Sequence, residues 1–262
     1  SMSIDMGSLR MNVIHDVLPG RPMGVAARVW RRSTHAALNW AFRGSPDRPD
    51  DSFAESGLPH MRQFRVPFSA MASACEVVLA CEDEAEALTL AEAAINEVQR
   101  IEHKFSRCRG DSIVSRINAA AGLAAVECDA ETLSLLAFAD SVYRSSGGLF
   151  DITTGALGPG ADRQTSRLPA PERPAEWRSL SGWQQVQRDG RHVRLAQPGM
   201  AIDFGSFGKA YAADRAATLM RARGAKHGYV NLAGDLRVLG PKPDGEPWMI
   251  GIQDPRRRGE VI

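Results

Sequence analysis

A lysine stands where a strand-to-helix turn is predicted, in the run AIDFGSFGKAYAADRA at residues 201–216. The first four residues are typical of the end of a buried strand, and two glycines then favour a tight turn. Apolar residues at helical spacing follow, and Gly224 is placed to end that helix. The positive end of a helix dipole disfavours a cation by a few tenths to about 1 kcal/mol. Lys209 therefore predicts an anion at this turn, and a solvated lysine on an ordinary turn is the alternative.

The same turn could bind phosphate through its backbone, because N–H groups at a strand–helix junction point at an anion. It is not a Walker A loop, since the glycine spacing is too short and Ala210 follows the lysine. Asp203 ends the predicted strand just before the turn. Its carboxylate could accept hydrogen bonds from turn amides, or it could bind a ribose or a base edge.

Three further segments carry polar residues that could do chemistry. Asp151 follows a double glycine in FDITTG, and Asp235 follows a predicted strand in NLAGD. Residues 106–118, SRCRGDSIVSRIN, contain a helix break with these polar candidates: Arg107, Arg109, Asp111, Ser112 and Asn118. Turn and capping roles are the alternatives for these residues. The histidines form no H-E-x-x-H pattern, and no Ser-His-Asp arrangement stands out.

The composition excludes several classes of protein. A net charge of +1 and 6% aromatic residues give no indication of a nucleic-acid partner. The four cysteines form no C-x-x-C pair, which favours buried, reduced thiols over a zinc or redox site. No run is long enough for a transmembrane helix. Arg31 and Arg32 precede a stretch too short and polar for an export signal, which predicts a cytoplasmic protein.

The chain divides into two regions. Residues 1–60 form an irregular extension with a short helix predicted near 23–42, and SPDRPDDS is typical of a linker. Regular patterning begins at Met61 and continues as one domain to residue 262. The last residues, QDPRRRGEVI, are typical of a turn that enters a strand, so we expect a C-terminal portion of this domain to lie beyond this sequence.

The domain alternates strands, helices and hairpins irregularly. Strands are predicted over 62–71 and 75–82, and a helix with a capping box of Asp83 and Glu86 follows and runs to Phe105. A second helix is predicted between Asp129 and the glycines at 147 and 148. These patterns favour mixed, largely antiparallel sheets packed with helices, an α+β fold.

The second half of the domain begins with a Pro-rich loop over 159–177. Residues 183–196 are typical of a hairpin with Asp189-Gly190 at its turn. Strands are also predicted over 227–232, 236–240 and 248–253, with Pro-Asp-Gly between the last two.

Read together and in order, five segments resemble the ApbE family, the FAD:protein FMN transferases. The matching runs are FSAMAS at 68–73, KFSRCRGDSIVSRINAAAG at 104–122, SSGGLFDITTGAL at 145–157, AIDFGSFGKAYAADRA at 201–216, and YVNLAGDLRVLG with WMIGIQDP at 229–255. The resemblance implies an ApbE-like, T-fold-related architecture in which these segments surround FAD.

The resemblance also implies a role for particular residues, without assigning a catalytic side chain. The residues implied in FAD binding are Met71, Cys108, Leu149, Phe150, Asp151, Asp203 and Lys209. Ser206 matches a position that contributes a ligand to a divalent metal through its main-chain carbonyl. On this interpretation Lys209 faces the FAD diphosphate or its metal complex.

The activity implied is Mg²⁺-dependent transfer of FMN from FAD to a threonine of a partner flavoprotein, with release of AMP. One alternative is an FAD pyrophosphatase that yields FMN and AMP. A non-catalytic FAD-binding module is the other. Related proteins are often exported or membrane-associated, so the resemblance implies a periplasmic or membrane-bound location instead of a cytoplasmic one.

Departures from the family pattern motivate the non-catalytic alternative. Cys108 stands where the family has Tyr or a similar planar side chain, so it cannot stack on a ring. Ala72 and Ala210 stand at positions of family glycines. The family also continues into an H-x-x-D-P run, an Asp and a Thr that complete the metal site, and these lie outside the 262 residues.

Overall fold

The computed structural model describes residues 61–154, 179–252, 254 and 256–257. The predicted extension over 1–60, with its short helix, lies outside the described residues, as does the Pro-rich loop over 159–177. None of the helices in the described part of the chain is long and apolar enough to cross a membrane.

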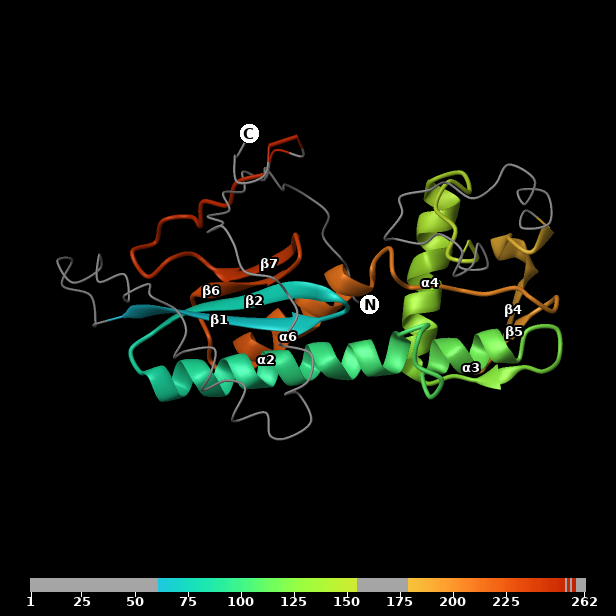
Figure 1. Cartoon of the computed structure of the whole chain (residues 1–262), viewed down its shortest axis with the longest axis horizontal. Coiled ribbons are helices and arrows are strands. Elements are labelled where there is room, and N and C mark those ends of the chain that lie inside the picture. Colours follow the sequence, from blue (N-terminus) through green and yellow to red (C-terminus); the bar gives the residue numbers. More distant parts are fainter. Residues whose placement is uncertain (1–60, 155–178, 253, 255, 258–262) are drawn as a thin grey trace.

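A four-stranded antiparallel sheet forms the first part of the molecule (Figure 1). Across the sheet its strands are β1 (Arg62–Ala70), β2 (Ser73–Cys81), β6 (Gly228–Leu232) and β7 (Asp235–Gly240). Alternate residues of β1, such as Phe64 and Val66, are buried, as expected for a strand with one covered face. Cys75 of β2 lies opposite Leu232 of β6. This register brings the β1–β2 and β6–β7 turns to the same end of the sheet.

Two long helices cover one face of this sheet. Helix α2 (Glu84–Phe105) contacts β1 and β2, and α6 (Gly208–Ala222) contacts β6 and β7. The two helices also pack on each other. Four of the five buried residues of α6 are alanines, which lets the backbones approach closely. Helix α6 therefore has little freedom to move against the sheet.

A second, smaller part lies at the far end of α2 (Figure 1). Its elements are α3 (Ile113–Ala119), β3 (Val126–Glu127), α4 (Ala130–Ser145), the 3-10 turn η3 (Trp183–Gln185), β4 (Val186–Asp189) and β5 (His192–Leu195). The strands form an antiparallel sheet in the order β3-β5-β4. Buried residues of both parts belong to one continuous hydrophobic core.

Several predicted elements are confirmed. The first two strands, the long helix, the helix opened by Asp129 and the 183–196 hairpin are all present. Asp129 caps α4 by accepting a hydrogen bond from the Thr132 amide. The strands predicted over 227–232 and 236–240 are β6 and β7.

Other predictions of local structure are wrong. Asp83 is the N-cap of α2, but its side chain caps no amide, so the predicted capping box does not form. Ile202 and Phe204 are buried without belonging to a strand, and Ala201 makes only an isolated parallel bridge to Thr154. Residues 248–252 form no strand. The indole N–H of Trp248 instead donates to the Gly240 carbonyl, 2.8 Å away, and ties this segment to the end of β7.

Candidate functional site

The turn that precedes α6 is held from both sides. The amide of Asp203 donates to the Ile152 carbonyl at 2.9 Å. The carboxylate of Asp203 accepts from the Gly205 amide at 2.8 Å, and its other oxygen lies 3.4 Å from Arg107 Nε. Asp203 therefore serves as a turn residue and also pairs with a cation. The N-terminus of α6 has no side-chain cap, so backbone N–H groups remain at this end for an anion.

Lys209 lies in the first turn of α6, and its ammonium is 3.7 Å from the carboxylate of Asp235. Asp235 begins β7, directly after the β6–β7 turn. The sequence predicts an anion beside this lysine, and the protein supplies one of its own. The contact also places the start of α6 at the end of the sheet where both hairpin turns lie.

Both hairpin turns contain residues in the left-handed backbone region. Met71 and Ala72 have φ of 50° and 55°, and Ala233 has φ of 56°. The pair in the β1–β2 turn has positive φ at both central positions, as a type I′ hairpin requires. Met71, predicted to contact FAD, thus belongs to a tight turn and packs partly against the core.

The loop between α2 and α3 carries Arg107 and Cys108. Arg107 reaches Asp203, whereas the Cys108 side chain is exposed. Ser112 is the N-cap of α3 and accepts from the Ser115 amide at 2.9 Å, which is the capping role considered for it. The short helix α3 itself was not predicted, because its two buried residues give too weak a periodic pattern.

Helix α3 has a second function in this region through Asn118. The Asn118 side chain accepts from the Ile202 amide at 2.8 Å and donates to the Ile202 carbonyl at 3.0 Å. These two hydrogen bonds satisfy a fully buried backbone without a partner strand. Asn118 therefore fixes the segment that positions Asp203.

The segment after α4 contains the three other predicted FAD contacts. Leu149 is 93% exposed, and the ring of Phe150 lies 6.3 Å from the ring of Phe207 at the N-cap of α6. Asp151 accepts from the Thr153 amide and hydroxyl at 2.8 and 2.6 Å, and its other oxygen accepts from the Trp183 amide at 3.0 Å. Both carboxylate oxygens of Asp151 thus organise a turn, which favours the turn alternative.

The structure brings most of the predicted residues together. Asp203, Ser206 and Lys209 share one turn, Phe150 reaches it through Phe207, and the Cys108 loop reaches it through Arg107. Ser206 is exposed at this turn. In the described ranges no group of three His, Cys, Asp or Glu side chains could hold a metal ion. These residues alone do not make a magnesium site, and Ser206 would be one ligand among several.

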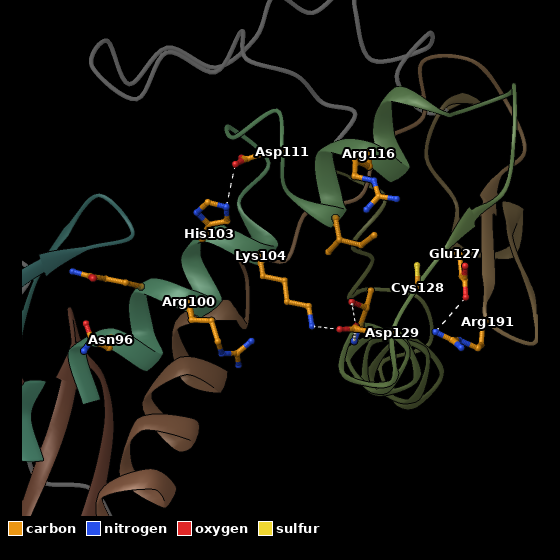
Figure 2. Close-up of a pocket in the computed structure, with 13 residues that line it drawn as sticks. Asn96, Arg100, His103, Lys104, Asp111, Arg116, Glu127, Cys128, Asp129 and Arg191 are labelled. Atoms are coloured by element: carbon orange, nitrogen blue, oxygen red, sulfur yellow. Dashed lines mark hydrogen bonds and ion pairs between the residues drawn. The ribbon is translucent and has the colours of Figure 1, made fainter. Parts of the chain in front are cut away.

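A cleft of about 800 Å³ opens elsewhere, between α2, α3 and the start of α4 (Figure 2). None of the residues that the family resemblance assigns to FAD or the metal lines this cleft, although Asp111 does. Figure 2 shows that Lys104 reaches across the cleft to Asp129, whereas His103 pairs with Asp111 at 3.0 Å on one side and Arg191 with Glu127 at 3.2 Å on the other. The cleft is therefore a different feature from the turn region around Lys209.

Comparison with known proteins defines the class of protein. The model of the ApbE family matches residues 71–262, which is most of the chain. The chain belongs to the ApbE family, and this confirms the resemblance carried by the five sequence runs.

Two similar relatives share one name. The FAD:protein FMN transferase of Salmonella typhimurium (strain LT2) is 30% identical over 166 residues, which cover 60% of this chain and 47% of the relative. That of Treponema pallidum (strain Nichols) is 29% identical over 224 residues, 78% of this chain and 61% of the relative. The chain spans about half the length of most curated relatives it matches.

Solved structures confirm the α+β fold. The ApbE protein from Thermotoga maritima aligns with a TM-score of 0.69 at 31% identity, over 76% of this chain and 66% of that one. The flavin transferase ApbE from Vibrio cholerae aligns with a TM-score of 0.66 at 22% identity, over 74% and 65% respectively. The observed mixture of helices and antiparallel sheets is therefore that of ApbE proteins.

Proposed function

We propose that this protein transfers the FMN moiety of FAD to a threonine hydroxyl of a partner flavoprotein and releases AMP. One observation carries the proposal. Asp203, Ser206 and Lys209, which the family resemblance assigns to FAD and its metal, lie on one turn at the start of α6. The name of the relatives, FAD:protein FMN transferase, supports the transfer of FMN from FAD to a protein.

The charges at the turn support binding of a diphosphate. Lys209 and Arg107 face Asp235 and Asp203 at 3.7 and 3.4 Å, longer than the roughly 2.7–2.9 Å of a strong charge-assisted hydrogen bond. Little interaction energy is lost when the Lys209 ammonium turns from Asp235 toward phosphate oxygens. The uncapped start of α6 adds backbone donors and a partial positive charge on the same side.

The reaction forms one bond and breaks one bond. The threonine oxygen attacks the phosphorus nearer the flavin, the bond from that phosphorus to the bridging oxygen breaks, and AMP leaves with the electron pair. The hydroxyl proton passes to solvent, and FMN remains attached as a phosphoester. Positioning and electrostatic stabilisation provide most of the catalysis in phosphoryl transfer. Lys209 and Arg107 are two cations at this turn that can hold the diphosphate in place.

The test is incubation of the protein with FAD, Mg²⁺ and a flavoprotein acceptor. We expect a fluorescent flavin that stays on the acceptor after denaturing electrophoresis, with AMP released in equal amount, and no transfer after addition of EDTA. AMP and free FMN without an acceptor would favour the pyrophosphatase instead. FAD binding without AMP release would favour the non-catalytic module, and no FAD binding at all would overturn the proposal.

A further inference from the structure

Three helices meet at one carboxylate, that of Glu131 in the first turn of α4. The Tyr211 hydroxyl of α6 donates to Glu131 Oε1 at 2.7 Å. From α2, the Arg100 guanidinium donates to both carboxylate oxygens at 2.7 and 2.9 Å, and Lys104 Nζ donates to Oε2 at 2.6 Å. We call these four residues the Glu131 cluster. Arg100 and Lys104 are visible in Figure 2 along the cleft beside this cluster.

The Glu131 cluster is partly shielded from water, although its Arg100 side chain is 41% exposed. The side chain of Glu131 is 22% exposed, and that of Lys104 is 21% exposed. Hydrogen bonds from Arg100, Lys104 and Tyr211 lower the pKa of Glu131 to about 2, even though burial opposes this. Burial and the hydrogen bond to Glu131 raise the pKa of Tyr211. Near neutral pH the pair is therefore a phenol that donates to a carboxylate, a strong form of hydrogen bond.

The position of Tyr211 links this cluster to the candidate site. Tyr211 lies two residues after Lys209 in α6. Its ring packs edge-on against Phe105 at 6.4 Å, and Phe105 packs on Phe204 at 5.5 Å. Phe204 directly follows Asp203. Both ends of the turn from Asp203 to Lys209 are thus tied to α2 and α4 through Tyr211 and its neighbours.

We propose that Tyr211 and Glu131 are positioning residues that fix the turn from Asp203 to Lys209 for binding of the FAD diphosphate. This inference rests on the function proposed above. Neither residue needs to touch the ligand. Tyr211 holds the first turn of α6, and Glu131 transmits that position to α2 and to α4, whose far end leads into Leu149–Asp151.

The test uses Tyr211→Phe, Glu131→Gln and the double variant. Calorimetry with FAD should show a dissociation constant about tenfold higher for each single variant, because a hydrogen bond to a charged group is lost. The FAD affinity of the double variant should be little lower than that of the single variant that binds FAD less tightly, since both changes act on the same Tyr211–Glu131 hydrogen bond. Tyr229→Phe is the matched control, because the Tyr229 ring packs on Trp248 in a different region, and it should bind FAD like the wild type.

Amide hydrogen exchange provides a second readout that needs no FAD. In Tyr211→Phe, we expect the amides of residues 205–212 to exchange about tenfold faster, with those of β2 and β6 unchanged. Uniform acceleration across β2 and β6 would mean a merely structural role and would overturn the inference. So would wild-type exchange at residues 205–212 together with wild-type FAD affinity.

The two readouts also separate this inference from the proposed function. If the wild-type protein bound no FAD, the function proposed above would fail, and so would the FAD-binding role of Tyr211 and Glu131. Faster amide exchange at residues 205–212 in Tyr211→Phe would then show only that Tyr211 orders the turn. If Glu131→Gln did not fold, Tyr211→Phe would still give both measurements, because it removes one hydroxyl and keeps the ring.

Discussion

Among the residues that the structure describes, three other than glycine have a left-handed backbone, and all three lie at the end of the sheet next to Lys209. Met71, Ala72 and Ala233 have φ between 50° and 56°. An L-residue with a Cβ pays roughly 1–2 kcal/mol for this conformation. Ala72 is also a position where the family pattern has glycine. The two hairpin turns beside the candidate site are therefore strained, as backbones at functional sites often are.

We expect Ala72→Gly to stabilise the protein by about 0.5–1 kcal/mol. Relief of the Cβ strain should exceed the entropy that glycine adds to the unfolded chain. The measurement is the urea midpoint at unchanged slope. The control is Ala74→Gly, an exposed position in the extended strand β2, which should destabilise. Equal destabilisation by both changes would contradict the argument.

We expect Lys209→Gln to weaken FAD binding while leaving the free energy of unfolding nearly unchanged. The Lys209–Asp235 contact is 3.7 Å long and about one third exposed, so its loss should change the free energy of unfolding by less than about 1 kcal/mol. Loss of a charge-assisted contact to the diphosphate should weaken FAD binding about tenfold. Titration calorimetry and urea unfolding give the two values. Lys226→Gln, at an exposed position after α6, should change neither. FAD affinity equal to wild type in Lys209→Gln would remove this lysine from the site.

At the scale of elements, helix α3 acts mainly through one side chain. Asn118→Ala removes both hydrogen bonds to Ile202, whose backbone is buried, and should destabilise by about 2–3 kcal/mol. Urea unfolding measures this change. Asn96→Ala, at an exposed position on α2, should stay within about 0.5 kcal/mol of wild type. Similar small effects of both substitutions would show that Ile202 finds other partners.

The elements predicted correctly are those with a long periodic signal or a specific turn. The stripe that ends at Phe105 and the Asp189-Gly190 turn are of this kind. Ile202 and Phe204 are apolar because they are buried, but Asn118 satisfies the Ile202 backbone, so no strand is needed. The segment 248–252 has strand-like composition, yet the Trp248 indole anchors it through a side chain. In both segments, tertiary contacts determine that no strand forms, and the local sequence pattern carries no information about those contacts.

The sequence also predicts one part of the candidate site and misses another. The turn with Asp203, Ser206 and Lys209 follows from its own sequence run, and the structure keeps these residues together. The partners of that turn do not follow from the sequence. Arg107 and Asp235 are about a hundred and thirty residues apart, and only the sheet register and the α2–α6 packing bring both to it.

At the scale of the whole molecule, ion pairs join α2, α4 and α6. Lys104 of α2 binds Glu131 of α4 and its N-cap residue Asp129, and Glu97 of α2 binds Arg215 of α6 at 3.2 Å. Burial raises the pKa of Asp129, but hydrogen bonds from Lys104 and Thr132 outweigh it and lower the pKa to about 2. Both carboxylates of α4 are therefore stabilised in the ionised form.

We expect the protein to lose stability as the pH falls from about 5 to 2. The unfolded chain takes up a proton at Glu131 near pH 4.5 and the folded chain only near pH 2, so the unfolded state binds more protons in this range. Glu131 should contribute about 2 kcal/mol of stability above pH 5 that is lost in this window. Urea unfolding at several pH values measures the slope. Glu131→Gln should reduce it, and an unchanged slope would assign the acid sensitivity to other groups.

The main sheet cannot be completed until β6 is available to pair with β2. Asn231 donates to Glu76 across 155 residues of chain, so the central strands of the main sheet lie far apart in sequence. Pairings of such long range form slowly. On the ribosome, the β1–β2 hairpin and α2 would emerge long before β6 and would expose the edge of β2 until then. Newly made chains are for that interval open to mispairing with one another, and a chaperone that covers an apolar strand edge would serve this protein during synthesis.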